Sequence, residues 1–333
     1  MSEVKFYSQD YIHSLVNRRA GERKFGESLA SVNSWEHLAQ CEQQYILLGI
    51  PEDIGVRANF GTPGTSLAWN SSLRTLCNIQ QNRFNDRNNI VVLGEINCDT
   101  EMRIAADITS EEPHFEKLLG DLVERIDAKV AVAIKKVVEA KKIPIIIGGG
   151  HNNSYGNLKG TSIALGTSLN CVNLDAHTDF RPLEHRHSGN GFSYASDEGY
   201  LENYFIFGMH KNYTSEAILK DIDDKNYRIK YALFEDLVQQ NSSFEFMIDK
   251  AKKHVSSKPF SVEIDLDAIA NMGSSASSPS GLTVEQTRFF LKEFVSHPNC
   301  CYIHICEGAP KLAAFPNQVS KTISYLVSDI LSL

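Results

Sequence analysis

The segment Val172-Asn-Leu-Asp-Ala-His-Thr-Asp179 joins the end of an apolar run to three side chains of metal-binding type. Asp175, His177 and Asp179 are spaced i, i+2 and i+4, which places all three on one side of an extended backbone. Carboxylates gathered where a buried strand ends are costly unless a cation neutralises them. The segment therefore predicts a metal site at the end of a strand.

Two further segments end apolar runs in a similar way. In Ile145-Ile-Ile-Gly-Gly-Gly-His151, three glycines let the backbone turn sharply before a histidine, and Val262-Glu-Ile-Asp-Leu-Asp267 ends in two spaced carboxylates. Four carboxylates and two imidazoles favour Mn²⁺ or a similar first-row ion, because Mg²⁺ and Ca²⁺ prefer oxygen. We expect a pair of such ions, and hence hydrolytic chemistry, held by His151, Asp175, His177, Asp179, Asp265 and Asp267.

Short apolar runs alternate with longer amphipathic segments along the chain. The runs cover residues 45–50, 90–93, 143–147, 171–174, 204–207, 260–264 and 301–305. Their continuous hydrophobicity is typical of strands covered on both faces. Residues 116–142 carry apolar side chains at helical spacing, and Thr283-Val-Glu-Gln286 is a capping box that opens another helix. The alternation predicts a doubly wound α/β fold with a mainly parallel β-sheet flanked by helices, in which ligands bind beyond the carboxyl ends of the strands.

Composition limits the classes of function. The chain has 333 residues, of which 42% are hydrophobic and 22% charged, which is typical of a globular protein with a full core. No linker-like segment divides it, so we expect one domain over residues 1–333, with residues 1–43 as an extension packed on it. The net charge of −8 and the lack of a Lys/Arg cluster argue against nucleic acid. No apolar stretch predicts a signal peptide or membrane span, and seven cysteines without a CxxC pair favour a reducing cytoplasm.

Two alternative interpretations assign the same residues other roles. The Asp and His residues could cap helices and bind solvent in ordinary loops. Gly148–Gly150 could form a phosphate-binding turn, although Asn153 stands where GxGxxG requires its last glycine and no Walker Lys-Ser/Thr follows.

Taken together, the three segments resemble the ureohydrolase (arginase–agmatinase–formimidoylglutamase) superfamily, whose signatures are a GG-x-H turn, a D-A-H-x-D segment and a D-x-D segment. The similarity runs from about Pro51 to Pro310. It implies an arginase-like three-layer α/β/α fold with two manganese ions. One ion would be held by His151, Asp175, Asp179 and Asp265, and the other by Asp175, His177, Asp265 and Asp267. Two such ions lower the pKa of a shared water toward neutrality, which prepares it to attack an amidine or guanidine carbon.

The resemblance also assigns catalytic carboxylates. Asp179, together with the metals, would stabilise the tetrahedral intermediate. Glu307, in Ile305-Cys-Glu-Gly308, stands where the family places a carboxylate that holds the cationic amidinium. The alternative for Glu307 is an ordinary glutamate on a surface loop.

Departures from the arginase pattern bear on the substrate. Arginases and agmatinases continue the D-x-D segment with Asp-Pro, whereas this chain continues with Ala-Ile-Ala270-Asn271. Arg181 follows the last ligand of the Asp175 segment by two residues, as is typical of formimidoylglutamases. It would bind a substrate carboxylate through two hydrogen bonds. The alternative is a structural ion pair that holds residues 182–187.

Other residues are candidates for contact with the substrate or for proton transfer. Ser188-Gly-Asn190 resembles the arginase loop that grips an amino acid's carboxylate, but Phe192 replaces the histidine that shuttles protons in arginases. His187, His185, Asp179 or water would then protonate the leaving amine. Arg57 and Asn59, in a Gly-rich segment, would bind substrate or hold that segment against the sheet. Residues 271–281 are small and polar, and predict a loop beside the site.

These observations predict a binuclear manganese hydrolase of small-molecule linear amidines. The favoured reaction converts N-formimidoyl-L-glutamate and water to L-glutamate and formamide in histidine degradation. One alternative is a hydrolase of a guanidino compound such as arginine, agmatine or a guanidino acid, which would release urea. Another is a non-catalytic metal-binding protein. The superfamily commonly forms homo-oligomers, but no sequence feature here indicates a subunit number.

Overall fold

A mixed ten-stranded sheet organises the protein, whose computed structural model describes residues 3–85, 87–224 and 228–332. The strand order is β1-β4-β3-β5-β10-β9-β6-β7-β8, and β2 pairs with β4 beside this path. Only the pairing of β1 with β4 is antiparallel among the described strands. The strands are β1 (Val4–Phe6), β2 (Ala30–Ser31), β3 (Tyr45–Gly49), β4 (Ile90–Ile96), β5 (Ile143–Ile147), β6 (Leu169–Leu174), β7 (Leu201–Met209), β8 (Ile229–Leu233), β9 (Phe260–Asp265) and β10 (Cys300–Cys306).

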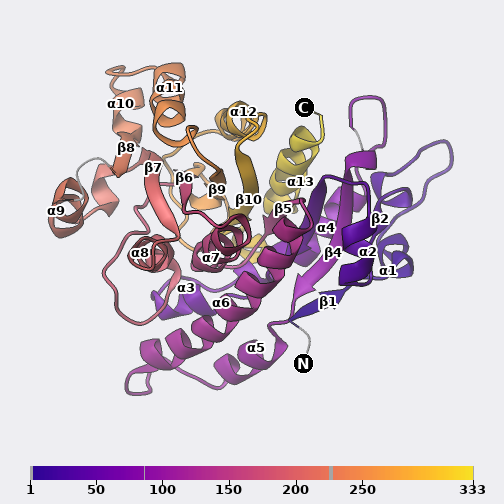
Figure 1. Ribbon diagram of the computed structural model, residues 1–333, viewed down its shortest axis with the longest axis horizontal. Helices are drawn as coiled ribbons and strands as arrows, with labels where there is room; N and C mark the ends of the chain where they lie inside the picture. Colours follow the sequence, from indigo (N-terminus) through magenta and orange to yellow (C-terminus); the bar gives the residue numbers. More distant parts are fainter. Residues whose placement is uncertain (1–2, 86, 225–227, 333) are drawn as a thin grey trace.

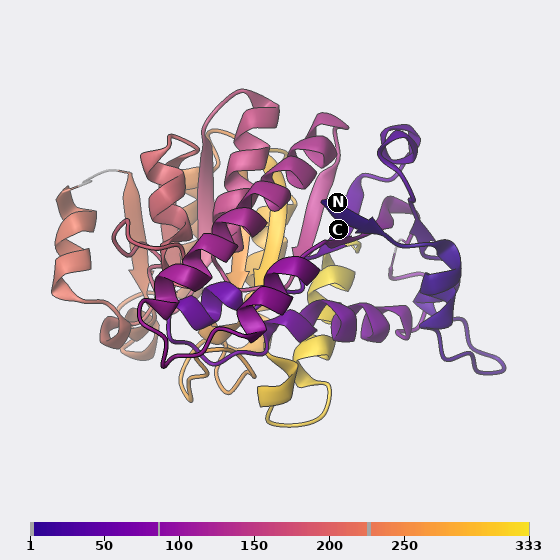
Figure 2. The same ribbon diagram turned by 90° about the horizontal axis from the view of Figure 1, so that it is seen from below.

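Helices cover both faces of this sheet (Figures 1 and 2). One core joins α4, α11, α12 and α13 to one face of the strands, and the other joins α6, α7 and α8 to the opposite face. Within β3, for example, Leu47 belongs to the first core, whereas Ile46 and Leu48 belong to the second. The helices are α1 (Gln9–Ser14), α2 (Trp35–Gln40), α3 (Ile54–Ala58), α4 (Ala68–Cys77), α5 (Asp99–Ala106), α6 (Phe115–Glu139), α7 (Asn153–Leu165), α8 (Gly191–Asp197), α9 (Glu216–Asp224), α10 (Phe234–Val238), α11 (Phe244–Val255), α12 (Val284–Val295) and α13 (Gln318–Ile330).

The predicted elements are present. All seven apolar runs form strands, and the helix predicted over residues 116–142 is α6. At the start of α12, the Thr283 hydroxyl accepts a hydrogen bond from the Gln286 amide, and the Gln286 side chain accepts one from the Thr283 amide. This reciprocal pair is the predicted capping box. The three-layer, mainly parallel α/β architecture is therefore confirmed.

Three strands lie where no apolar run predicted one. β1 and β2 have three and two residues, and both pair with β4 near one edge of the sheet. β8 is the opposite edge strand, and only Ile229 and Ala232 of its five residues are buried. The residues before β3 contribute side chains such as Ile12, Phe25 and Leu29 to the core.

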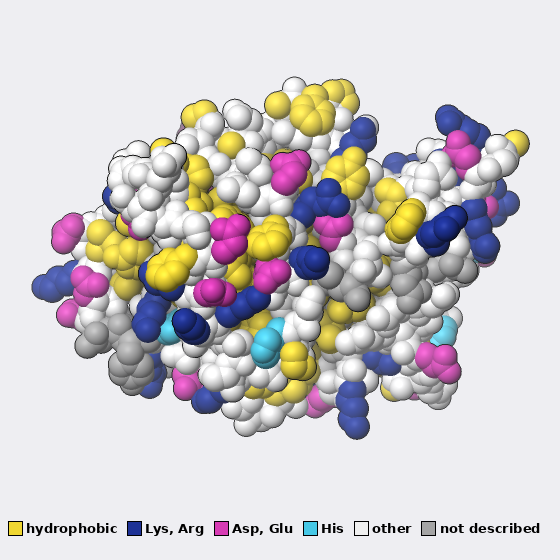
Figure 3. All heavy atoms as spheres, turned by 90° about the horizontal axis from the view of Figure 1, so that it is seen from above, with side chains coloured by type: hydrophobic (Ala, Val, Ile, Leu, Met, Phe, Trp, Pro, Cys, Tyr) yellow, Lys and Arg dark blue, Asp and Glu magenta, His cyan; other side chains and the backbone are white. Residues whose placement is uncertain are grey.

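The structure shows where the charged residues and the cysteines lie. On the face shown in Figure 3, acidic side chains lie among basic ones. All seven cysteines are free thiols, and five of them are buried. Among the described residues, no helix combines the length and the apolar character that crossing a bilayer requires.

Candidate metal centre

The carboxyl ends of four neighbouring strands carry the predicted metal ligands and Glu307. β5 leads into His151, β6 leads into Asp175, and β9 ends at Asp265. β10 lies between β5 and β9 and leads into Glu307. Because these strands are parallel, their carboxyl ends share one edge. The fold thus gathers segments that are far apart in the sequence.

The turns at this edge have uncommon backbone conformations. Gly148 and Gly149 have φ angles of +90° and +71°, and a Cβ atom on Gly149 would lie only 2.3 Å from the side-chain nitrogen Nδ2 of Asn153. Asp179 and Glu307 also have positive φ angles, 44° and 61°. For residues other than glycine, such angles cost of order 1–3 kcal/mol and often occur at functional sites. Here they occur at two residues whose side chains face the same site.

The first group of potential ligands surrounds the ring of His151. Its Nδ1 atom lies 2.7 Å from Asp179 Oδ2, 3.1 Å from Asp265 Oδ2 and 3.3 Å from Asp175 Oδ2. These four residues offer ligand atoms that all lie within 4.8 Å of one another. They are the four that the sequence assigned to one ion.

The second group surrounds the ring of His177. Its Nδ1 atom lies 3.3 Å from Asp267 Oδ2 and 3.5 Å from Asp175 Oδ1. Asp175 belongs to both groups and presents a different oxygen to each histidine, an arrangement that suits a bridging carboxylate. Asp265 belongs to the first group, and its Oδ1 atom accepts a hydrogen bond from the Asp267 amide at 2.8 Å. Its predicted bridging to the second ion stays a prediction.

Burial and mutual repulsion raise the pKa values of two acids of the first group. Burial and the charge of Asp175 raise the pKa of Asp179 to about 6. Burial and the charges of Asp267 and Asp175 raise the pKa of Asp265 well above its ordinary value. Acids this close cannot all ionise without a compensating charge. One buried oxygen, Asp267 Oδ1, also has no hydrogen-bond partner among the described residues. The oxygen- and nitrogen-rich donor set therefore fits a pair of first-row divalent cations.

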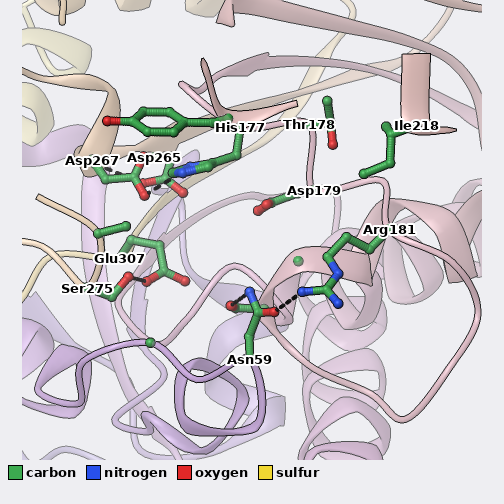
Figure 4. Close-up of a pocket in the computed structure, with 15 residues that line it drawn as sticks. Asn59, His177, Thr178, Asp179, Arg181, Ile218, Asp265, Asp267, Ser275 and Glu307 are labelled. Atoms are coloured by element: carbon green, nitrogen blue, oxygen red, sulfur yellow. Dashed lines mark hydrogen bonds and ion pairs between the residues drawn. The ribbon is translucent and has the colours of Figure 1, made fainter. Parts of the chain in front are cut away.

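The two groups open onto one cavity of about 260 Å³ (Figure 4). His177, Asp179, Asp265, Asp267 and Glu307 line it. Ser275 and Ala276 complete one wall, so the polar loop predicted over residues 271–281 does shape the pocket. Tyr213, which also lines the cavity, stacks on the ring of His177 with 5.0 Å between ring centroids.

Glu307 is a buried acid of this cavity and not a surface loop residue. Its Oε1 atom accepts a hydrogen bond from the His151 amide at 2.6 Å, and Oε2 accepts one from the Ser275 hydroxyl. Burial, partly opposed by the Ser275 hydrogen bond, raises its pKa to about 8. A cation bound beside this carboxyl would lower that pKa and would be held by the resulting charge.

Arg181 lies across the cavity from Glu307 (Figure 4), and Asn59 and Ser188 also line the cavity. Arg181 Nη1 donates to Asn59 Oδ1 at 2.8 Å, and Asn59 Nδ2 donates to Ser188 Oγ at 3.2 Å. Arg181 Nη2 also lies 3.1 Å from Glu184 Oε1. Both interpretations of Arg181 therefore have a structural basis, because the guanidinium faces the cavity and also pairs with the segment that follows it.

Two predicted substrate contacts do not reach the cavity. Arg57 Nη2 donates to the carbonyl oxygen of Ile108 at 2.7 Å, and so holds its segment in place, as the alternative interpretation had it. Asn190 is fully buried, and its Oδ1 atom accepts hydrogen bonds from the Arg186 guanidinium and the His187 amide. Arg57 has a partner far along the chain, whereas the partners of Asn190 lie three and four residues before it, and both residues have supporting roles.

The histidine candidates for proton transfer are also outside the cavity. His187 Nδ1 accepts a hydrogen bond from the Gly189 amide at 3.0 Å, and Nε2 lies 3.0 Å from Glu184 Oε1. Burial lowers the pKa of His187 to about 4, so the ring is neutral at pH 7 and carries no spare proton. His185 Nε2 lies 3.1 Å from the carbonyl oxygen of Ala58. Neither ring lines the cavity, which argues against the assignment of His187 as a catalytic residue.

Two carboxylates of the protein accept hydrogen bonds from the backbone N–H groups of the glycine turn. The Gly150 amide donates to Glu52 Oε1 at 3.0 Å, and the next amide, that of His151, donates to Glu307. This use of the turn's N–H groups leaves no cradle of the kind that binds phosphate. Glu52 was not predicted from the sequence. It is fully buried, and its only local signal is a glutamate three residues after the end of β3.

This geometry defines a buried carboxylate–histidine site, suited to two cations, at the carboxyl edge of an α/β sheet. A family model described as the arginase family matches residues 43–332. The chain belongs to the arginase family.

Relatives within the family have a common name. A formimidoylglutamase of Geobacillus thermodenitrificans is 32% identical over 205 residues, which are 57% of this chain and 62% of that protein. A formimidoylglutamase of Geobacillus sp. WCH70 is 29% identical over 276 residues, which are 81% of this chain and 78% of that protein. The first match thus leaves more than a third of its partner uncovered.

Solved structures share the fold. The formimidoylglutamase of Bacillus subtilis has a TM-score of 0.74 and 17% identity, with 95% of this chain and 93% of that chain covered. A Trypanosoma cruzi formiminoglutamase determined with Mn²⁺ has a TM-score of 0.73 and 17% identity, with 93% and 98% covered. At this identity the likeness establishes the fold alone.

Proposed function

We propose that this protein is a binuclear manganese hydrolase that converts N-formimidoyl-L-glutamate and water to L-glutamate and formamide. The names of its relatives, the absence of Asp-Pro after Asp267 and the position of Arg181 support this substrate. We further propose that the reaction serves histidine degradation in the cytoplasm, in keeping with seven unpaired thiols.

One observation carries the proposal. A single cavity presents a guanidinium (Arg181), a carboxyl (Glu307) and members of both groups of ligands. Formimidoylglutamate carries an amidinium at one end and carboxylates at the other. Arg181 would bind a carboxylate through paired N–H donors, and Glu307 would hold the amidinium. The reacting carbon would then lie beside Asp179.

The ligands we assign are His151, Asp175, Asp179 and Asp265 for one Mn²⁺ ion, and Asp175, His177, Asp267 and Asp265 for the other. When bound, the two ions would supply a water whose pKa is near neutrality. The oxygen of this water would form a bond to the formimidoyl carbon, and the bond from that carbon to the glutamate nitrogen would break as that nitrogen takes up a proton.

The chain's own groups would orient the substrate and move the proton. Glu307, fixed by the His151 amide and the Ser275 hydroxyl, would align the amidinium plane. Asp179 faces the cavity, whereas the rings of His185 and His187 do not. We therefore assign to Asp179 the transfer of the water's proton to the leaving amine.

Parallel assays of the Mn²⁺-loaded protein would test this function. Formimidoylglutamate, arginine, agmatine and a guanidino acid are supplied separately, and formamide, urea and the released amines are quantified. We expect formamide and glutamate from formimidoylglutamate, and at least about 100-fold lower kcat/KM for the guanidino compounds. Release of urea from one of them as the fastest reaction would support the ureohydrolase alternative. No turnover by a protein that binds two ions would support a non-catalytic role.

A further inference from the structure

A second cluster of buried polar groups lies behind the candidate metal ligands. Glu263 of β9 and both Tyr302 and His304 of β10 are fully buried. The Tyr302 hydroxyl donates to Glu263 Oε1 at 2.6 Å, and His304 Nδ1 lies 2.6 Å from Glu263 Oε2. Each oxygen of this carboxylate thus has a partner on the neighbouring strand. Nothing in the proposed reaction uses these three residues.

This cluster extends to the ring and the turn of His151. Glu263 Oε2 lies 3.5 Å from His151 Nε2, which has no hydrogen-bond partner among the described residues. His304 Nε2 lies 3.3 Å from the carbonyl oxygen of Gly148, the first residue of the turn that leads to His151. The cluster therefore contacts both the candidate ligand and the backbone that positions it.

The two nitrogens of His151 face different surroundings. Nδ1 faces the three carboxylates of the first ligand group, whereas Nε2 faces Glu263. A neutral imidazole that offers a lone pair at one nitrogen carries its proton at the other. If Nδ1 binds a cation, the proton is on Nε2, and Glu263 Oε2 is the carboxylate oxygen that faces it, at 3.5 Å. Histidine ligands usually donate this second N–H to a carboxylate, a carbonyl or water, which fixes the ring and its tautomer.

We propose that Glu263, held by Tyr302 and His304, is a positioning residue that fixes the orientation and tautomer of His151 for binding of the first metal ion. The proposal rests on the proposed function, because it takes His151 as a manganese ligand. Glu263 does not line the cavity, so its effect on the substrate is indirect.

A metal ion in this second cluster is the competing interpretation. His151, Glu263, His304 and Cys306 offer ligand atoms that lie within 4.8 Å of one another. However, both oxygens of Glu263 are already engaged by Tyr302 and His304. An ion there would also need a lone pair on His151 Nε2, and a neutral ring cannot offer lone pairs at both nitrogens. The geometry thus favours positioning.

The test compares full-length Glu263→Gln with the wild type by calorimetric titration of metal-free protein with Mn²⁺. The substitution keeps the size of the side chain and removes its charge. We expect one of the two ions to bind about 10–100-fold more weakly, the range seen when such supporting partners are changed. At saturating Mn²⁺, kcat should fall while KM stays within about twofold. Tyr302→Phe, which leaves the charge of Glu263 in place, should weaken the same ion only a few-fold.

Thr287→Val is the matched control for loss of a buried polar group. Thr287 is fully buried on α12, and its hydroxyl donates to the Thr283 carbonyl, away from His151. We expect wild-type Mn²⁺ affinity from this variant. Unchanged affinity and kcat in Glu263→Gln would refute the positioning role while the wild type still binds two ions. A third ion in the wild type that Glu263→Gln loses would also refute it. If the wild type binds no manganese, the proposed function itself fails.

Discussion

Replacement of Arg181 by alanine should raise KM for formimidoylglutamate and leave kcat nearly unchanged. Within the described residues, its guanidinium has two polar contacts, of Nη1 with Asn59 and of Nη2 with Glu184. A guanidinium has five N–H donors, so others remain for a substrate carboxylate. A hydrogen bond to a charged group contributes about 1.5–3 kcal/mol. Because the Arg181 side chain is 45% exposed, solvent screening favours the lower end. About 1.5 kcal/mol corresponds to a roughly tenfold rise in KM.

Glu184→Gln is the matched variant. It removes the internal carboxylate that competes with substrate for Arg181. Exposed ion pairs contribute about 0.2–1 kcal/mol, so KM should fall by about 1.5- to 5-fold. The assay is the initial rate of formamide release at saturating Mn²⁺, with the metal content of each variant measured. Arg181→Lys keeps the charge but not the planar fork, and should have an intermediate KM.

The opposite pattern would refute the assigned role. If Arg181→Ala leaves KM within about twofold of the wild type, Arg181 does not bind the substrate carboxylate. A lower free energy of unfolding with unchanged KM would instead identify the structural ion pair with Glu184. Equal rises in KM for formimidoylglutamate and for an amidine without carboxylates would also contradict the reasoning, because the second compound has nothing for Arg181 to bind.

The other predictions concern the metal ligands, pH and the supporting residues. Asp267→Asn should lower the affinity for the Mn²⁺ ion at His177, as measured by titration, while the ion at His151 stays bound. Loss of a residue that only supports a ligand lowers metal affinity by about 10–100-fold, and loss of a ligand itself should have at least that effect. The metal-free protein should become less stable between about pH 5 and pH 8. Burial raises the pKa of Glu307 from 4.5 to about 8, so above pH 4.5 the folded state keeps a proton that the unfolded chain has lost. Thermal melts should show a melting temperature that falls as the pH rises, and Mn²⁺ should reduce this loss of stability most near pH 8. A metal-free protein whose stability increases from pH 5 to pH 8 would contradict the raised pKa of Glu307. Asn190→Ala should lower the free energy of unfolding by about 2–4 kcal/mol in urea, because the buried Arg186 guanidinium and the His187 amide lose their acceptor. His187→Asn should leave the pH dependence of kcat unchanged, and a lost ionisation would restore His187 as the proton donor.

The local sequence was sufficient to predict the central strands and the candidate ligands. Central strands such as β5 and β9 are buried on both faces, so their hydrophobicity is continuous and easily read. Asp175, His177 and Asp179 stand close together in one short segment, so they are easily read as candidates. Their predicted arrangement on an extended backbone was wrong, because the chain bends at residues 176–177 and Asp179 has a φ angle of 44°. Edge strands carry a weaker signal, and β1 and β8 were missed for this reason.

Residues whose role depends on distant partners could not be assigned from the sequence. The carbonyl of Ile108 determines what Arg57 does. Asn190 accepts from the nearby Arg186 guanidinium, and the distant Asp127 carboxylate and Asn152 carbonyl hold that guanidinium in place. Glu263 lies in the same apolar run as two candidate ligands, and only the neighbouring strand reveals that its carboxylate is paired. Motifs within single segments were enough to predict the ligands, whereas the residues that support those ligands can be identified only from the folded structure.

The central claim is that His151, Asp175, His177, Asp179, Asp265 and Asp267 hold two Mn²⁺ ions. Anomalous diffraction at the manganese edge from crystals of the Mn²⁺-soaked protein tests it most directly. We expect two peaks, one beside His151 with Asp179 and one beside His177 with Asp267, with Asp175 between them. A single peak, no peak, or peaks away from these side chains would contradict the claim.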